Sequence, residues 1–368
     1  MIRKNAFAAS VSVVAMFAST MAMAQADLTA LYEAAKAEGQ LTTIALPHTW
    51  CGYGAVIEAF KAKYPGITVN ELNPDAGSAD ELEAIRANKG NTGPRAPDVI
   101  DVGLSFGPAA KEEGLLQPYK VSTWDEIPAD AKDADGFWYG DYYGVLSFGI
   151  NKTVMTEASP QSWADLHKPE YANSVAFAGD PRTSNNAIMS VYAAGLSTGA
   201  DAAGAAAAGL DFFKKLNEAG NFVPVDAEAS VLAQGTATIV MNWDYNLLAM
   251  RDGFAGNPEM DIVVPSDSVI AGVYIQAISA FAPHPNAAKL WMEYLYSDEG
   301  QLGWLAGYCH PIRFNALAAA GKVPQDLLDK LPAAENYAKA VFPSLAEQDA
   351  AKKQIAAEWD SVVGANVQ

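Results

Sequence analysis

The chain has 368 residues, is 50% hydrophobic, and carries a formal net charge of −19 at pH 7. Such an acidic surface argues against a nucleic-acid partner, because phosphate groups are bound by basic faces. A chain of this length is too long for one ordinary hydrophobic core and suits two domains of about 150–200 residues each.

Residues 1–24 have the pattern of a secretory signal peptide. The positive residues Arg3 and Lys4 precede a mostly apolar run, and Ala22-Met23-Ala24 supplies a small-x-small cleavage site. No cysteine follows this site to carry a lipid, and no later run approaches the roughly 20 apolar residues of a membrane span. We therefore expect a secreted, soluble protein without a lipid anchor; a retained membrane helix is the alternative.

The chain contains two cysteines, Cys51 and Cys309. In an oxidising compartment they are candidates for a disulfide, and two unrelated buried thiols are the alternative. The four histidines are scattered without the spacing of metal ligands, so we expect no metal site and no cofactor.

Short apolar runs alternate with helical stretches, which predicts an α/β fold with largely parallel sheets. Proline and glycine end several of these elements, as at Pro47 and at Pro65-Gly66. In chain order we expect a helix over 27–38, strand 41–46, helix 55–64, strand 67–72, helix 79–88, strand 98–102, apolar run 145–150, strand 174–178, a helix from about 186, helix 210–219, strand 237–242, a strand ending at 265, run 271–281, helix 287–305 and a helical tail from about 324.

Ligands of open α/β sheets bind beyond the carboxyl ends of strands, where loops lead into helix N-termini. Four loops fit this rule, and the first two lie in the N-terminal half. Trp50 and Tyr53 bracket a glycine before a helix, although partial core is the alternative. Ser105 and Phe106 follow a strand and precede Pro108, so nearby backbone N–H groups are placed to meet an anion.

The third loop, 179–185, contains Asp180, Arg182 and Ser184. The planar donor fork of Arg182 suits a carboxylate or phosphate ligand. Alternatively, Arg182 pairs with Asp180 as a structural clamp on the loop.

In the fourth loop, Trp243 and Tyr245 flank Asp244. One carboxylate between two aromatic rings suits an amine. Arg182 and Asp244 together predict a small charged solute, amine-bearing and amino-acid-like or a γ-amino acid, with a polyamine next. Sugar phosphates or phosphonates are the alternative through Arg182 and the helix N-termini.

Several segments in order resemble the bacterial extracellular solute-binding proteins of ABC importers, which have the type-II periplasmic binding protein fold. The clearest is HPNAAK at 284–289 with YLYSDEGQ at 294–301. Supporting segments are FKAKYPGI at 60–67, PDV at 97–99, EGLLQPY at 113–119, WYG at 138–140, GINK at 149–152 and SWADL at 162–166.

This resemblance implies two α/β lobes that close around a ligand, with lobe 1 over 27–150 plus 268–318 and lobe 2 over 151–267 plus 319–368. It implies crossovers near 145–150 and 266–273, a C-terminal tail packed on lobe 2, and both cysteines in lobe 1. It also implies a periplasmic, monomeric, non-enzymatic protein that delivers its ligand to a membrane permease. The family's ferric-ion binders use an adjacent tyrosine pair where this chain has only Tyr245, so ferric iron is a weaker alternative.

A secreted serine hydrolase is the competing hypothesis from another class. Residues 103–107 match G-x-S-x-G, a nucleophile elbow centred on Ser105. His284 or His310 would then be the base. Gly114 leaves little room for the following helix, and no glycine-rich oxyanion segment precedes the motif, so we favour the binding protein.

Overall fold

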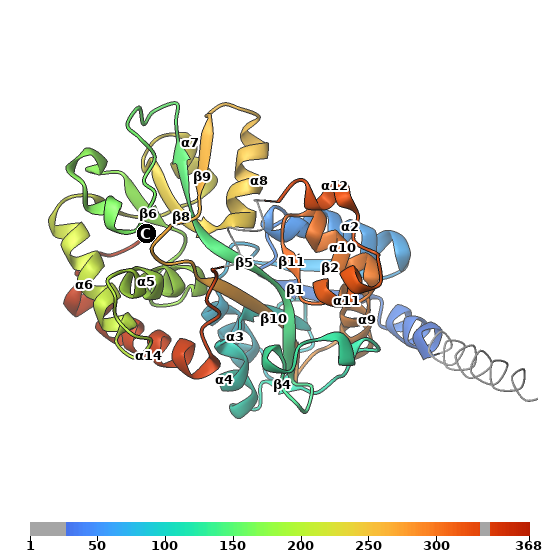
Figure 1. Ribbon diagram of the computed structural model, residues 1–368. Coiled ribbons are helices and arrows are strands. Elements are labelled where there is room, and N and C mark those ends of the chain that lie inside the picture. The colour runs from blue at the N-terminus through green and yellow to red at the C-terminus, as the bar shows by residue number, and fades with distance from the viewer. Residues whose placement is uncertain (1–26, 332–338) are drawn as a thin grey trace, which may run out of the picture.

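A computed structural model describes residues 27–331 and 339–368 of the chain. The predicted signal peptide and part of the predicted tail lie outside the described residues. The described part forms two lobes of mixed α/β structure, with helices packed around a two-stranded and a nine-stranded sheet (Figure 1). The predicted α/β fold is confirmed. None of the helices described is long and apolar enough to cross a membrane.

The first lobe begins with a helix over 27–38 and the parallel pair β1 and β2. Its helices bury apolar faces against these strands, and Phe60 of the second helix is fully buried. The elements of this part are β1 (Gln40–Ile44), η1 (Trp50–Gly52), α2 (Tyr53–Lys63), β2 (Thr68–Leu72), α3 (Ser78–Ala87), β3 (Val99–Gly103), α4 (Phe106–Glu112), β4 (Leu116–Gln117), η2 (Trp124–Glu126) and η3 (Ala129–Ala131).

Strand β5 (Trp138–Asn151) runs through both lobes, as the long green arrow in Figure 1 shows. Its first half pairs with β10 (Ala271–Ser279) and β11 (His310–Pro311), and its second half pairs with strands of the second lobe. The apolar run predicted at 145–150 is therefore the second half of a longer strand. Gly144 is a site of close packing in this strand, since a Cβ there would lie 2.5 Å from the Asp244 carboxylate.

The second lobe is built on β6, β7 and β8, which are mutually parallel. Strand β5 runs antiparallel to both of its partners in this lobe, β8 and β9. The prediction of largely parallel sheets is wrong for the larger sheet, because both crossover strands run antiparallel to their neighbours. The elements are η4 (Ala164–His167), η5 (Pro169–Tyr171), β6 (Val175–Phe177), α5 (Asn185–Ser197), α6 (Ala205–Glu218), β7 (Phe222–Asp226), α7 (Ala229–Ala233), β8 (Ile239–Trp243), α8 (Asp244–Phe254) and β9 (Met260–Val263).

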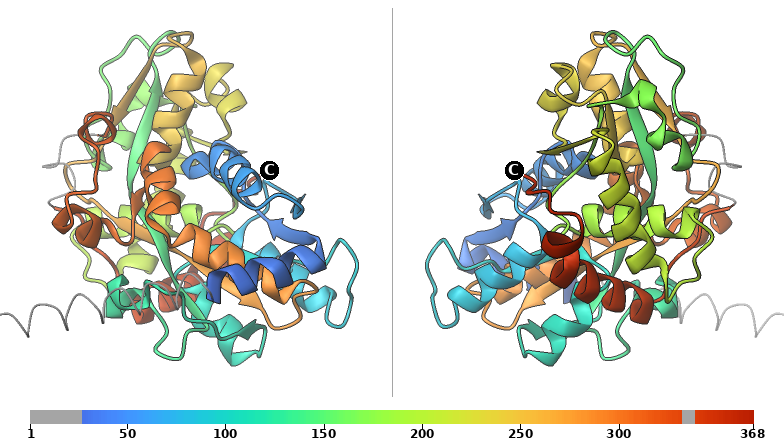
Figure 2. Two further views of the ribbon diagram at one scale, coloured as in Figure 1. Left: turned by 90° about the vertical axis from the view of Figure 1, so that its right-hand side faces the viewer. Right: turned by 90° about the vertical axis from the view of Figure 1, so that its left-hand side faces the viewer.

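The helix predicted over 287–305 is two helices, α9 (Pro285–Leu295) and α10 (Asp298–Ala306). Ser297 separates them because its side chain accepts a hydrogen bond from the Gly300 N–H and so starts a new helix. The chain then continues through α11 (Phe314–Ala319), α12 (Gln325–Leu328) and α14 (Leu345–Val362). Helix α14 packs on α5 and α6 of the second lobe, as Figure 2 shows.

A disulfide joins Cys51 to Cys309 with a Cα–Cα distance of 5.3 Å, which confirms the predicted bond. It connects the short helix η1 to the segment after α10. Cys51 has a positive φ of 48°, and a Cβ on Gly307 would lie 2.2 Å from the Cys51 backbone. The disulfide therefore holds a tightly packed turn directly beside Trp50.

Candidate functional site

A cavity of about 720 Å³ lies between the two lobes. Such a volume is typical of sites for small organic ligands. The first lobe contributes Ala45, Pro47, Thr49, Trp50, Asp101 and residues from 74 to 81, the crossover strands contribute Tyr142 and Tyr274, and the second lobe contributes segments between 178 and 254. Strands β3, β6 and β8 end at this cavity and α5 and α8 begin there, as expected for an α/β sheet.

The wall of the cavity is acidic and aromatic. Among the described residues, no lysine, arginine or histidine lines it. The aromatic side chains are Trp50, Tyr142, Phe254 and Tyr274. The seven carboxyl side chains are Asp75, Asp80, Glu81, Asp101, Asp180, Asp226 and Glu228. This composition creates a negative potential in a recess with apolar surfaces, which attracts a cation.

The innermost carboxyl groups are those of Glu81, Asp101 and Asp141, named here the acid cluster. All three side chains are at least 95% buried. Asp101 Oδ2 accepts hydrogen bonds from the hydroxyl groups of Tyr53 and Tyr142, each 2.7 Å long. Glu81 Oε2 accepts from the Asp101 backbone N–H at 2.9 Å.

Asp141 completes the acid cluster behind Asp101. Its Oδ1 accepts from the Tyr142 N–H at 2.6 Å, and its Oδ2 accepts from Gln276 Nε2 at 3.3 Å. Gln276 also donates to the Tyr53 hydroxyl at 2.9 Å. Apart from the bond between the Asp101 and Asp141 carboxyl groups themselves, every described donor to the cluster is a neutral hydroxyl, amide or backbone group.

Burial without a counter-charge shifts the acidity of the cluster. Desolvation raises the pKa of Asp101 to about 7, although the tyrosine hydrogen bonds oppose the shift. Burial, and then the charge of Asp101, raise the pKa values of Glu81 and Asp141 well above the ordinary range. A neutral, proton-bearing cluster is therefore favoured when no cation is present.

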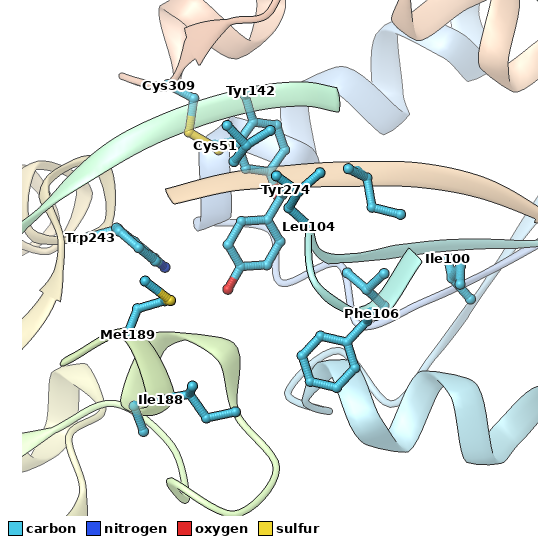
Figure 3. Close-up of a cluster of buried hydrophobic side chains, with 14 of the residues drawn as sticks. Cys51, Ile100, Leu104, Phe106, Tyr142, Ile188, Met189, Trp243, Tyr274 and Cys309 are labelled. Atoms are coloured by element: carbon cyan, nitrogen blue, oxygen red, sulfur yellow. A yellow bond between two sulfur atoms is a disulfide. The ribbon is translucent and has the colours of Figure 1, made fainter. Parts of the chain in front are cut away.

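Aromatic side chains border the acid cluster at the cavity. Trp50 Nε1 donates to the Tyr142 hydroxyl at 2.7 Å, and the Trp50 ring meets the rings of Tyr245 and Tyr274 edge-on at 5.4 and 5.3 Å. Figure 3 shows the Tyr142 ring beside the disulfide and the Tyr274 ring beside Trp243. The disulfide therefore fixes the backbone that presents Trp50 to the cavity.

A sequence model of the family described as bacterial extracellular solute-binding protein matches residues 95–338. The chain belongs to this family. The family resemblance predicted from the sequence is confirmed.

Two relatives and one solved structure show how the chain compares with known members of the family. It is 29% identical over 192 residues to a probable ABC transporter periplasmic-binding protein of Sinorhizobium fredii, covering 50% of this chain and 51% of that one. It is 25% identical over 226 residues to the spermidine/putrescine-binding periplasmic protein of Escherichia coli, covering 59% and 64%. The matches thus span about half to two thirds of these relatives.

Among solved structures, the periplasmic binding protein AfuA from Actinobacillus pleuropneumoniae, with fructose-6-phosphate bound, aligns with a TM-score of 0.70. The alignment covers 88% of this chain and 98% of that one at 20% identity. This likeness establishes the two-lobed periplasmic binding protein fold.

Three of the ten residues predicted to bind ligand line the cavity of this solute-binding protein: Trp50, Asp180 and Ser184. Arg182 is not among the described lining residues. Its Nε and Nη2 donate to the Asp180 carboxylate at 2.6–2.9 Å, and its Nη1 and Nη2 reach Asp360 and Asn366 at 3.1 and 3.0 Å. This geometry is that of a structural clamp.

Four more predicted residues lie in the protein interior. Tyr53, Trp243, Asp244 and Tyr245 are all fully buried, and the described lining of the cavity does not include them. Asp244 Oδ1 accepts a hydrogen bond from the Val145 N–H at 2.9 Å, at the point where β5 passes between the lobes. Contact of these four side chains with ligand stays a prediction.

Ser105 and Phe106 lie at the start of α4, also outside the described lining. Lys352 of α14 covers both residues. Its ammonium donates to the Ser105 carbonyl at 2.8 Å and lies 4.2 Å from the centre of the Phe106 ring. The loop that was predicted to bind ligand is therefore in contact with a lysine of the second lobe.

The geometry around Ser105 gives little support to the hydrolase hypothesis. His284 Nδ1 bonds Asp98 Oδ2 at 2.9 Å, and Asp98 precedes β3 whereas Ser105 follows it. Five strand residues span roughly 17 Å, far beyond the reach of a general base. His310 lies on β11 and stacks on Tyr143 at 5.0 Å between ring centres.

Apart from Asp180, the carboxyl groups of the cavity were not among the predicted ligand-binding residues. Asp101 stands in a strand that is buried on both faces, where polar and apolar positions do not alternate. The available signal was an aspartate within the apolar run Val99–Val102, because a buried carboxylate needs a partner or a function. Within 27–331 and 339–368, no group of three or more His, Cys, Asp or Glu side chains is arranged to hold a metal ion.

Proposed function

We propose that this protein is the solute-binding component of an ABC importer and that it captures an organic cation with ammonium groups, a polyamine or diamine first. The observation that carries the proposal is the cavity wall of seven carboxyl groups with no cationic side chain among its described residues. Cationic ligands bind such carboxylates by charge-assisted hydrogen bonds and pack on aromatic faces.

An anionic or zwitterionic ligand needs a counter-cation that the described wall does not offer. Arg182, the cation predicted for that purpose, makes five hydrogen bonds with Asp180, Asp360 and Asn366, counting those from its guanidinium alone. This favours a polyamine over an amino acid, a sugar phosphate or a phosphonate. The name of the Escherichia coli relative, a spermidine/putrescine-binding protein, agrees with this choice.

Closure of the lobes follows from charge at the cavity. Asp75 belongs to the first lobe and Asp226 to the second. Burial is the main cause that raises the pKa of Asp226, and the negative charge of Asp75 raises it further. Like charges across the cleft oppose closure, and a ligand cation between them removes the repulsion. The ligand thus biases the open–closed equilibrium by its differential contacts.

The remaining parts of the proposal follow from the family. The lobes are bounded as 27–150 plus 268–318 and 151–267 plus 319–368, and the closed form is delivered to a permease. Transport, rather than catalysis, is the role of the site. The protein acts in the periplasm after removal of residues 1–24.

A thermal-shift screen of refolded protein tests the ligand class. The panel contains spermidine, 1,4-diaminobutane, γ-aminobutyrate, glutamate, fructose-6-phosphate, a phosphonate and ferric citrate. A polyamine at 100 times its Kd should add about 2.7 kcal/mol to the free energy of unfolding, with a clear rise in Tm. A shift produced only by an anionic compound, or by none of the amines, contradicts the proposal.

A further inference from the structure

The acid cluster has an unusual set of neighbours for three carboxyl groups in one place. Glu81 and Asp101 line the cavity, whereas Asp141 lies directly behind them. The titratable and polar groups that face the cluster from each surrounding element are Trp50 of η1, Tyr53 of α2, Asp80 of α3, Tyr142 of β5, Tyr245 of α8, Tyr274 and Gln276 of β10, and Tyr296 after α9. None of these groups is a cation.

Three ionised carboxylates in such surroundings are strongly disfavoured. Each would lose its hydration, and each would repel the others at short range. The neutral donors around the cluster stabilise one carboxylate well, since Asp101 Oδ2 accepts two tyrosine hydrogen bonds, but they supply no countercharge for a second. The unliganded cluster therefore retains at least one proton near neutral pH.

Buried oxygen atoms at the cavity indicate that a hydrogen-bond donor takes the place of that proton when ligand binds. Asp101 Oδ1, Asn185 Oδ1 and Asn186 Oδ1 are buried and accept no hydrogen bond from a neutral donor within the described part of the chain. The Asp101 carboxyl group does bond the Asp141 carboxyl group, which places the proton of the cluster between the two. All three residues line the cavity. Asn185 packs against β3 so closely that a Cβ on Gly103 would lie 2.2 Å from its amide carbon. The first and second lobes thus present acceptors to the same recess, and only a donor satisfies them.

We propose that the ligand's ammonium group, carrying N–H donors, binds at the acid cluster in exchange for a proton. The balance is simple: R–NH₃⁺ enters, the proton shared by the carboxyl groups leaves to solvent, and the charge of the recess is conserved. Capture is then strong at neutral pH and weak in acid. This inference rests on the proposed function, because it concerns the same cavity and the same class of ligand.

Calorimetric titration of the wild-type protein with spermidine tests the exchange. Titrations at pH 6.5 in buffers of different ionisation enthalpy give the number of protons released, while the ligand amines stay fully protonated. We expect about one proton released per ligand. We also expect the association constant to rise up to tenfold per pH unit between pH 5.5 and 7 and to level off above that range. Binding with no proton release and no pH dependence overturns the inference.

A permethylated diamine, which carries the charge but no N–H donors, tests the acceptors. It should bind at least tenfold more weakly than the parent diamine, since it leaves the buried oxygens unsatisfied. Equal affinity for the two compounds contradicts a donor-specific subsite.

Asp101→Asn is the matched variant, and Asp130→Asn at an exposed position of η3 is the control. Asp101→Asn should release less than half as many protons, and the control should behave as wild type. If Asp101→Asn does not fold, the buffer series on the wild-type protein still decides the question. Absence of amine binding at every pH overturns the proposed function, and the exchange with it, whereas binding without proton release overturns the exchange alone.

Discussion

Two acidic regions border the same cavity and differ in what neutralises them. At the mouth, the Asp180 carboxylate is held by three hydrogen bonds from the Arg182 guanidinium. At the inner end, the acid cluster is held only by tyrosine hydroxyl groups, an amide and backbone N–H groups. A carboxylate that already has a guanidinium contributes little attraction for a ligand cation. We therefore propose that the acid cluster determines the ligand's charge and that the Arg182 loop supports the wall.

The largest expected effect is on affinity at the acid cluster. Asp101→Asn removes a carboxylate that is 5% exposed while keeping a group of similar shape that still accepts from Tyr53 and Tyr142. Loss of a buried partner for an ammonium group should weaken spermidine binding about 100-fold, or about 2.7 kcal/mol. Calorimetry at pH 7.5 measures the change. An affinity within threefold of wild type, with the variant folded, would show that the ligand cation binds elsewhere.

Stability of the unliganded protein should fall as pH rises, which is a second test of the cluster. The pKa of Asp101 is about 7 in the folded protein and 3.8 in the ordinary state, so the folded form binds the extra proton in this window. Its contribution to stability is complete below about pH 4 and is lost as pH rises to about 7. The loss amounts to about 1.4 kcal/mol per pH unit for one proton.

Chemical denaturation of wild type and Asp101→Asn from pH 5 to pH 8 separates this contribution from other titrating groups. As pH rises, we expect the free energy of unfolding of the wild type to fall relative to that of Asp101→Asn. A constant difference across this range would mean that Asp101 is already ionised at pH 5. Such a result would also remove the basis for proton exchange.

Arg182→Met tests the other side of the comparison. The variant loses the contacts with Asp180, Asp360 and Asn366 and should lower the free energy of unfolding by about 1–2 kcal/mol, since the group is partly exposed. Because Asp180 is released toward the cavity, amine affinity should stay within threefold of wild type. A tenfold loss of affinity in a folded variant would show that the guanidinium contacts the ligand.

The sequence predicted the fold well because its signals are local. Proline and glycine stops and the ordered family segments located most helices and strands within a few residues. The break between α9 and α10 was missed because the apolar spacing continues across Ser297, and only the side-chain cap reveals a new start. Only the apolar second half of the crossover β5 was predicted, because the first half contains Gly140 and Gly144, whose place in a strand depends on close tertiary packing.

Loops that border the cavity were predicted from the sequence, but only some of the side chains selected within them line it. Trp50, Asp180 and Ser184 line the cavity, yet Trp243, Asp244 and Tyr245 turn into the core. At a junction of strand and helix, side-chain direction depends on the strand register, which composition does not give. Asp101 was overlooked for a related reason, because a strand buried on both faces has no polar alternation to identify its inward positions.

The smallest expected effect concerns a contact between the lobes that lies away from the ligand. Lys352 belongs to the second lobe, and its side chain bonds the Ser105 carbonyl and covers the Phe106 ring in the first. Burial lowers the pKa of this lysine, and the cost of burying its charge is offset by these two contacts together with the Asp349 carboxylate at 3.6 Å. Lys352→Met should therefore weaken the closed form by about 1 kcal/mol, which lowers amine affinity about fivefold without altering the cavity.

Lys353→Met is the matched control for this contact, because Lys353 is the next residue of α14, is 74% exposed and forms its ion pair with Asp349 of the same helix. Its described interaction with the first lobe is limited to the charge of Glu112 in α4, without a hydrogen bond. Its amine affinity should equal that of wild type. Small-angle scattering without ligand should show a more open average shape for Lys352→Met than for the control. Lys352 is outside both the acid cluster and the Arg182 loop. An unchanged affinity would therefore mean that this contact does not contribute to closure. The free energy of closure would then come from the cavity, where the ligand's ammonium groups lie between carboxylates of the two lobes.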